Sequence, residues 1–357
     1  MADLIRSGID RRRFMFGTAA VGAAAVVTGC TSNTPEADDT AEETTTSAAP
    51  AGQNSAPGKP VTIGFSAPAS DHGWIAAITN NARSQAEKFE DVDLKVTEGT
   101  NDLALQISQV QTLINDKVDA LVILPHDGNA LTETARAAMD AGIPVINVDR
   151  VFASERAYRS FIAGDNYGMG IAAGTYIGQR LTDDGVSNPV IAEIAGIDSL
   201  PLTKARSQGF SDALKTFGFS VGPRQAAEFT VESGDEVTRN LLEGAPQIDA
   251  MWNHDDDQGI GVLAAINDLG RDEFFMVGGA GSLNAMQEIK SGNSVLQATV
   301  TYPPTMSASG INLARLVAQG RGMTDLVELE VPKSIIVSSA TVTADNVDQY
   351  MPLGFKS

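Results

Sequence analysis

AGIPVINVDR, at residues 141–150, contains a short apolar run that begins at Pro144 and ends in the polar pair Asp149-Arg150. A run of this length, bounded by glycine and proline, is typical of a buried strand. Polar side chains at the carboxyl end of such a strand lie where α/β proteins bind their ligands. The stretch therefore predicts a strand of a parallel sheet and two candidate ligand contacts.

The same pattern recurs along the chain on both sides of this strand. Apolar runs lie at residues 61–65, 93–96, 120–124, 144–148 and 161–163, and again at residues 190–194, 219–229, 250–252, 274–277 and 295–302. Between the runs, apolar residues recur with helical spacing, as at Ile107, Val110, Leu113 and Ile114. Strands that alternate with helices predict parallel sheets covered on both faces. Two such series predict two α/β lobes with a ligand site in the cleft between them.

Four segments at or near the predicted strand ends resemble one known family. Residues 141–150 resemble the AGIPVIxxDR segment of periplasmic ribose-type and galactose-type sugar-binding proteins. Residues 164–166 (GDN), with the glycines that follow them, resemble the family's first crossover into its second lobe. Residues 206–210 (RSQGF) are similar to its RxxGF helix, and residues 277–279 (VGG) resemble its VGFDG strand end. The resemblance runs from about residue 60 to the C-terminus, with the segments in the family's order.

The resemblance implies an α/β fold of the periplasmic-binding-protein type I. Two lobes, each a parallel sheet flanked by helices, would be joined by three hinge crossings, expected near residues 163–164, 302–303 and 331–332. The N-terminal lobe would comprise residues 60–163 plus 303–332. The C-terminal lobe would comprise residues 164–302 plus 333–357.

In the N-terminal lobe, the resemblance implies ligand contacts at His72, Trp74, Asp149 and Arg150. Carboxylate and guanidinium groups form paired hydrogen bonds with neighbouring hydroxyls, and an aromatic face covers the C–H surface of a sugar. Two alternatives remain open. Asp149 and Arg150 could form a structural ion pair, and Trp74 could belong to the core.

In the C-terminal lobe, the resemblance implies contacts at Lys204, Arg206, Phe229, Asp255 and Tyr302. Phe229 would be the aromatic that opposes Trp74. The RxxGF segment leaves open which of the two cations, Lys204 or Arg206, enters the site. Tyr302 lies at the second crossing, where packing in the hinge is an equal alternative.

The N-terminal residues have the features of an export signal. Arginines at residues 11–13 precede a short segment rich in Ala, Gly and Val, which ends in small residues before Cys30, the only cysteine. The pattern resembles a bacterial lipoprotein signal, and its RRxFM head resembles twin-arginine signals. Residues 1–29 would then be a signal peptide and Cys30 an acylation site. The alternative, a membrane-spanning or core helix, is disfavoured because spanning takes roughly 20 mostly apolar residues.

Residues 30–59 are rich in Thr, Ser, Ala, Pro and acidic residues and nearly devoid of large apolar ones. Such a segment buries too little surface to offset its chain entropy, so it predicts a disordered linker. We therefore expect an exported protein that is lipid-anchored at the outer face of the cell membrane.

The formal net charge of −20 opposes binding to nucleic acid and to highly anionic ligands. Residues 254–257 (HDDD) suggest a metal site, but neighbours on an extended segment point to opposite faces. Glycines at positions 168, 170 and 174 suggest a dinucleotide loop, but the next predicted strand does not end in the required acidic residue. We predict no metal and no cofactor.

The predicted function is that of the solute-binding subunit of an ABC importer, a monomer that delivers its ligand to a membrane permease. The sequence has no GxxxxGK[ST], GxSxG or HExxH motif, so the permease and ATPase would be separate chains and catalysis lacks a candidate centre. Two alternatives are a ligand-presenting sensory protein of the chemoreceptor type and a carbohydrate-active enzyme.

The predicted ligand is a small neutral polyhydroxy compound. Ala280 stands where the VGFDG segment has its acid, so one strong acceptor for ring hydroxyls is missing. The loss favours a linear sugar alcohol such as xylitol, threitol or erythritol, with a pentose as the alternative.

Overall fold

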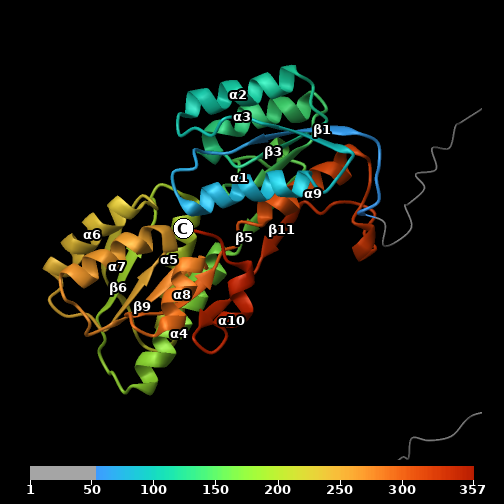
Figure 1. The fold of residues 1–357 in the computed structure, drawn as a ribbon. Helices are drawn as coiled ribbons and strands as arrows, with labels where there is room; N and C mark the ends of the chain where they lie inside the picture. The colour runs from blue at the N-terminus through green and yellow to red at the C-terminus, as the bar shows by residue number, and fades with distance from the viewer. Residues whose placement is uncertain (1–53) are drawn as a thin grey trace, which may run out of the picture. The chain divides into compact units, whose positions relative to one another are not determined.

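The computed structural model describes residues 54–357, whose strands form two separate sheets (Figure 1). The predicted signal peptide (residues 1–29), the predicted acylation site Cys30 and residues 31–53 of the predicted linker lie outside the described residues. Within the described part, no helix is long and apolar enough to cross a membrane.

The first sheet has six strands, all paired in parallel. In spatial order they are β11 (Ser334–Val337), β5 (Ser160–Gly164), β4 (Val145–Val148), β3 (Ala120–Ile123), β1 (Val61–Ser66) and β2 (Val92–Val96). The chain moves outward from β1 in one direction to β2 and in the other to β3. A crevice forms beyond the carboxyl ends of the strands at such a switch point, and this is where α/β proteins bind ligands.

Helices cover both faces of the first sheet: α1 (Gly73–Ala86) and α9 (Met306–Ala318) on one, α2 (Leu103–Asn115) and α3 (Gly128–Asp140) on the other (Figure 1). Successive side chains of a strand point to opposite faces. Val122 accordingly packs with α1 and α9, whereas Leu121 and Ile123 pack with α2 and α3. A strand covered on both faces is apolar throughout, which explains the uninterrupted apolar runs of the sequence.

The second sheet repeats this arrangement with one difference. In spatial order its strands are β12 (Thr341–Thr343), β10 (Leu296–Thr301), β9 (Phe275–Ala280), β8 (Ala250–Asn253), β6 (Ile191–Ala195) and β7 (Val221–Ala226). Strand β12 pairs antiparallel with β10, and the other pairs are parallel. The second sheet is therefore mostly parallel, as predicted, with one antiparallel strand at its edge.

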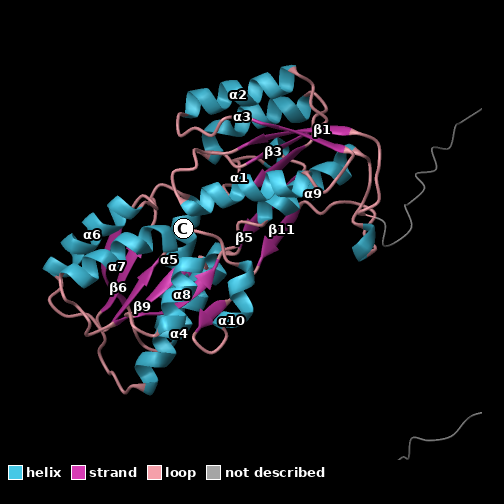
Figure 2. Ribbon diagram, in the orientation of Figure 1, coloured by secondary structure: helices cyan, strands magenta, loops and turns pink. Residues whose placement is uncertain are grey.

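Helices also enclose the second sheet (Figure 2). They are α4 (Asn166–Asp183), α5 (Pro201–Thr216), α6 (Val231–Gly244), α7 (Asp256–Asp268) and α8 (Leu283–Ser291), with the short α10 (Val347–Tyr350) after β12. Helices α4 and α5 pack together with buried residues such as Trp252, whereas α6, α7 and α8 pack on the opposite face with residues such as Met251.

The chain passes three times between the sheets. It leaves the first sheet after β5, returns to it after β10, and leaves it again between β11 and β12. The third crossing was predicted at residues 331–332, which is too early. Strand β11 pairs in parallel with β5, so residues 334–337 belong to the first sheet and not to the C-terminal lobe. Four residues with alternating exposure carry too weak a pattern to reveal this pairing from the sequence.

The last part of the predicted linker is ordered. Arg315, on α9 and only 1 % exposed, donates two hydrogen bonds to the carboxylate of Asp91 and one each to the main-chain oxygens of Asn54 and Ala56. The main-chain N–H of Gly58 also donates to Asp91. A buried guanidinium is stable only when its donors are satisfied, and these carbonyls satisfy them. The prediction of a wholly disordered linker is therefore wrong at this end. Arg315 and Asp91 are called the N-terminal clamp below.

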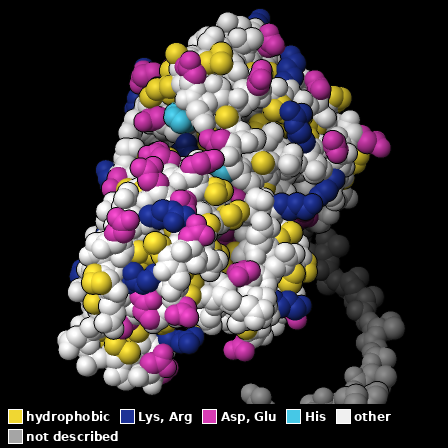
Figure 3. Space-filling view, turned by 60° about the vertical axis from the view of Figure 1, so that its left-hand side comes forward, with side chains coloured by type: hydrophobic (Ala, Val, Ile, Leu, Met, Phe, Trp, Pro, Cys, Tyr) yellow, Lys and Arg dark blue, Asp and Glu magenta, His cyan; other side chains and the backbone are white. Residues whose placement is uncertain are grey.

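Acidic and basic side chains are interspersed with scattered apolar ones over the face shown in Figure 3.

Candidate ligand-binding site

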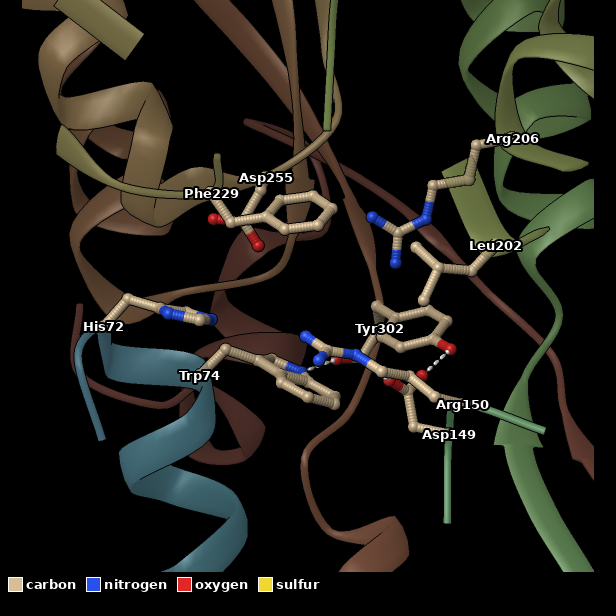
Figure 4. A pocket seen from close by; sticks show the side chains of 9 residues that line it. All are labelled: His72, Trp74, Asp149, Arg150, Leu202, Arg206, Phe229, Asp255 and Tyr302. Atoms are coloured by element: carbon tan, nitrogen blue, oxygen red, sulfur yellow. Dashed lines mark hydrogen bonds and ion pairs between the residues drawn. The ribbon is translucent and has the colours of Figure 1, made fainter. Parts of the chain in front are cut away.

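Side chains from both lobes surround a cavity, and each belongs to a segment that follows a strand of one of the two sheets (Figure 4). The lining residues are His72, Trp74, Asp149, Arg150, Leu202, Arg206, Phe229, Asp255 and Tyr302. The structure thus brings together all but one of the candidate residues taken from the sequence. Lys204 is the exception, and Leu202 is a lining residue that the sequence analysis missed.

The periodicity of α5 explains both differences. Residues four apart lie on the same face of a helix, and residues two apart do not. Leu202 and Arg206 therefore share the face that lines the cavity, whereas Lys204 is exposed and does not line it. Arg206 is the buried member of the pair, at 4 % exposure. Once Arg206 is placed in the site, helical spacing alone could have found Leu202.

Asp149 and Arg150 directly follow β4, and Asp149 adopts a left-handed backbone conformation with φ of 62°. Asp149 Oδ1 accepts a hydrogen bond of 2.5 Å from the Tyr302 hydroxyl. Arg150 Nε lies 3.9 Å from Asp149 Oδ2, too far for a hydrogen bond, while Arg150 Nη1 donates to the His126 carbonyl at 2.8 Å. Both side chains line the cavity, so they form more than the structural ion pair considered above.

Trp74 is held at two points. Its main-chain N–H donates to Asp257 Oδ2 at 2.8 Å, and its indole N–H donates to the Tyr302 carbonyl at 2.9 Å. Its ring lies 5.7 Å from that of Tyr302, centroid to centroid. Trp74 belongs to the hydrophobic core and also lines the cavity. The two alternatives considered for it, a ligand contact and a core residue, are therefore compatible.

Phe229 lies across the cavity from Trp74 in Figure 4. It follows β7 with φ of 64°, and its N–H donates to Gln258 Oε1 at 3.2 Å. A Cβ at Gly196 would lie 2.0 Å from the Phe229 ring, and a Cβ at Gly164 would lie 2.2 Å from the ring of Tyr302. These two glycines therefore allow the rings to lie against the strand ends.

Asp255 begins α7 as its N-cap. Its Oδ1 accepts from the main-chain N–H groups of Asp257 at 2.8 Å and Gln258 at 3.2 Å, and Oδ2 has no partner among these hydrogen bonds. Burial raises the pKa of Asp255 to about 6, and the Asp257 carboxylate acts in the same direction. The two acidic residues that follow Asp255 do not cap the helix, because Asp257 accepts from the Trp74 N–H and Asp256 accepts from the loop after β9.

Asp256 is buried and forms hydrogen bonds with the loop after β9. Its carboxylate accepts hydrogen bonds from the main-chain N–H groups of Gly279, Gly281 and Ser282 and from the Thr299 hydroxyl. The loop contains Ala280, which is buried but does not line the cavity.

Among the described residues, no group of three or more His, Cys, Asp or Glu side chains is placed to hold a metal ion.

His72 is the N-cap residue of α1, and its Nδ1–H donates a 2.6 Å hydrogen bond to Asp71 Oδ1, since an ionised carboxylate only accepts. Burial lowers the pKa of His72, but this hydrogen bond and the nearby carboxylates of Asp255 and Asp257 raise it, and the net shift is upward. The raised pKa of His72 favours its charged form beside these carboxylates.

The fold is that of a two-lobe α/β protein with a candidate ligand site between two mostly parallel sheets. Residues 63–322 match the model of the periplasmic binding protein domain, and the chain belongs to this family. The resemblance and the fold class taken from the sequence are therefore confirmed. Members of the family bind solutes, and the chain is a solute-binding protein and not an enzyme.

Relatives and solved structures agree with this assignment. The chain is 30% identical over 253 residues to the ribose import binding protein RbsB of Bacillus subtilis, which covers 71% of this chain and 80% of the relative. An ABC transporter solute-binding protein of Mycobacterium smegmatis, solved with glycerol, has a TM-score of 0.74 at 24% identity over 84% of this chain and 99% of the other. Another from Bacillus halodurans, solved with myo-inositol, has a TM-score of 0.73 at 22% identity over 83% and 99%. At these identities the two structures show the shared fold.

Proposed function

We propose that the chain is the solute-binding subunit of an ABC importer and that it captures a small neutral polyhydroxy compound, a sugar alcohol of four to six carbons or a pentose. The carrying observation is the charge balance of the cavity. Two carboxylates, Asp149 and Asp255, face two guanidinium groups, Arg150 and Arg206, in a space that Trp74 and Phe229 bound from opposite sides.

This arrangement suits hydroxyl groups in two ways. Guanidinium groups only donate hydrogen bonds and carboxylates only accept them, whereas a hydroxyl does both. A neutral ligand leaves the paired charges balanced, while an added charge would be buried without a partner. The named solutes of the related proteins, ribose, glycerol and myo-inositol, are all neutral and polyhydroxylated, which supports the proposal.

Isothermal titration with matched pairs tests the ligand class. We expect xylitol to bind more tightly than xylose, and ribitol more tightly than ribose, because Ala280 leaves the site without the acceptor that ring hydroxyls would use. A thermal-shift screen that includes threitol and erythritol would identify the preferred chain length, since a ligand raises apparent stability by mass action. Tighter binding of both ring sugars would overturn the sugar-alcohol assignment, and no binding of any polyol or sugar would overturn the proposed function.

The affinity should also depend on pH. With the pKa of Asp255 at about 6, its carboxylate is present at pH 7.5 and mostly protonated at pH 5. Because an ionised carboxylate is the stronger hydroxyl acceptor, we expect binding to weaken about 10-fold over this range. His72 titrates nearby, so the Asp255→Asn variant is the matched control and should show a flatter profile. An unchanged profile in Asp255→Asn would assign the effect elsewhere.

The proposed location is the outer face of the cell membrane, with acylation at Cys30. Membrane fractionation of the native host should recover wild-type protein in the detergent phase of a Triton X-114 partition and Cys30→Ala in the aqueous phase. Detergent partitioning of Cys30→Ala would contradict the anchor.

Delivery to a permease, rather than to a sensory receptor, is also part of the proposal. Deleting the gene should abolish uptake of the labelled ligand by the host, because the importer has no other source of captured solute. Normal uptake combined with a lost behavioural or transcriptional response would instead favour the sensory function.

A further inference from the structure

A chain of hydrogen bonds links Asp149, which follows a strand of the first sheet, to Arg206 on α5 of the second lobe. The Tyr302 hydroxyl donates to Asp149 Oδ1 at 2.5 Å, Asn166 Nδ2 donates to Tyr302 Oη at 3.0 Å, and Arg206 Nε donates to Asn166 Oδ1 at 2.8 Å. Asn166 is the first residue of α4, and it lines the adjoining cavity but not the one described above. It is thus a central link between three residues that do line the ligand cavity.

The available donors and acceptors allow only one orientation of the Asn166 carboxamide. Arg206 has no acceptor, so the group that faces its Nε must be the oxygen of the Asn166 carboxamide. The Asn166 nitrogen must then face Tyr302, whose oxygen is free to accept because its only proton points to the Asp149 carboxylate. Burial raises the pKa of Tyr302 well above its usual value, which keeps that proton in place.

The two sides of Asn166 hold different parts of the site. Arg206 is further fixed by a 3.1 Å hydrogen bond from Nη1 to the His254 carbonyl, and its guanidinium carbon lies 4.6 Å from the centre of the Tyr302 ring. On the other side, the main-chain carbonyl of Tyr302 accepts a hydrogen bond from the indole N–H of Trp74. Rotation of the Asn166 side chain would therefore disturb a cation and an aromatic group of the cavity together.

We infer that Asn166 is a positioning residue of the ligand site, which sets Arg206 and Tyr302 relative to each other without contacting the ligand itself. The inference rests on the proposed function, because its effect is on ligand affinity. A carboxamide is required, since it offers an acceptor on one side and a donor on the other. A carboxylate of the same shape offers two acceptors, and two carboxylates would then compete for the single proton of Tyr302.

A double-mutant cycle tests this inference in the full-length protein. The variants are Asn166→Asp, Tyr302→Phe and their combination, titrated by calorimetry with xylitol, ribitol, xylose and ribose. We expect Asn166→Asp to weaken binding of the best of these ligands by about 10-fold or more in the wild-type background. In the Tyr302→Phe background, the same change should cost less than about 3-fold, because no hydroxyl oxygen faces the new carboxylate.

Two controls separate positioning from other effects. Asn129→Asp places the same new charge in the adjoining cavity and should change affinity by less than about 2-fold. Thermal unfolding of each variant shows that it is folded at the titration temperature, and Asn166→Ser provides a smaller substitution should Asn166→Asp fail to fold. Asn166→Ser should also weaken binding, because it cannot span the distance between Tyr302 and Arg206.

The outcomes are distinguishable. Unchanged affinity of folded Asn166→Asp or Asn166→Ser, or an equal loss in both backgrounds of the cycle, overturns the role of Asn166 while the proposed function stands. Failure of the wild-type protein to bind these four ligands and every sugar alcohol and sugar of the thermal-shift screen overturns the proposed ligand class and, with it, the inference.

Discussion

Arg206→Met is expected to weaken ligand binding by about 100-fold or more. Arg206 is buried in the cavity wall, and its hydrogen bonds to Asn166 and to the His254 carbonyl leave Nη2 for the ligand. Hydrogen bonds of charged groups contribute roughly 1.5–3 kcal/mol each, and loss of this cation also leaves Asp149 and Asp255 facing a single guanidinium. Methionine keeps the length and apolar packing of the arginine stem. Calorimetric titration of both proteins measures the effect.

Lys204→Met provides the matched control on the same helix. Lys204 carries the same charge two residues away, but it points away from the cavity and is exposed. We expect its removal to change the affinity by less than about 2-fold. A large loss in Lys204→Met, or none in Arg206→Met, would show that the cavity described here is not where the ligand binds.

Arg315→Met is expected to lower the free energy of unfolding by about 3–5 kcal/mol without a comparable change in ligand affinity. The substitution removes both hydrogen bonds to Asp91 and leaves a buried carboxylate without its cation, which is strongly destabilising. The guanidinium also lies 4.2 Å from the centre of the Phe89 ring. Urea unfolding followed by circular dichroism gives the change, and the clamp lies outside the cavity, so titration below the unfolding temperature separates the two effects.

Two comparisons make this prediction specific. Arg239→Met removes ion pairs with Asp235 and Asp268 that are more accessible to solvent than the clamp, so it should cost less than Arg315→Met. Combining Arg315→Met with Asp91→Leu should recover part of the loss, because neither charge then remains buried alone. If the single variant is as stable as wild type, the N-terminal clamp contributes no net stability.

The clamp should also make the free energy of unfolding depend on pH. Burial raises the pKa of Asp91, but hydrogen bonds from Arg315, Gly58 and Gln319 lower the pKa by more. The pKa of Asp91 therefore falls well below its usual range. A carboxyl whose pKa is depressed in the folded state stabilises the protein above the pKa of the unfolded chain, about 3.9, and this contribution is lost as the pH falls further.

Much of the fold was predictable because local pattern and burial agree. The run that forms β4 is buried throughout, and such runs alternate with helices along the chain. This alternation predicts parallel sheets. The site residues next to strand ends, such as Asp149, could be located because strand ends converge in a parallel fold. Their alignment with one family then supplied the remaining candidates.

The parts that were missed depend on contacts distant in sequence. Arg315 and Asp91 are 224 residues apart, and nothing near Arg315 marks it as a buried cation. Strand β11 becomes a strand by pairing with β5, more than 150 residues earlier in the chain, so its four residues carry little signal of their own. Asn166 lay within a quoted motif, but its function requires Tyr302 and Arg206 to approach from other elements.

The N-terminal clamp makes the two lobes mechanically unequal. A pulling force that reaches the folded part through Asn54 enters at Arg315, on a helix that packs against the first sheet. Helix α9 would transmit such a load into the interior of that lobe and not into the crossing segments. The second lobe, which contributes no residue to the clamp, would receive little of this load. A load applied to the chain before Asn54 would therefore act on the first lobe and not on the segments that join the two lobes.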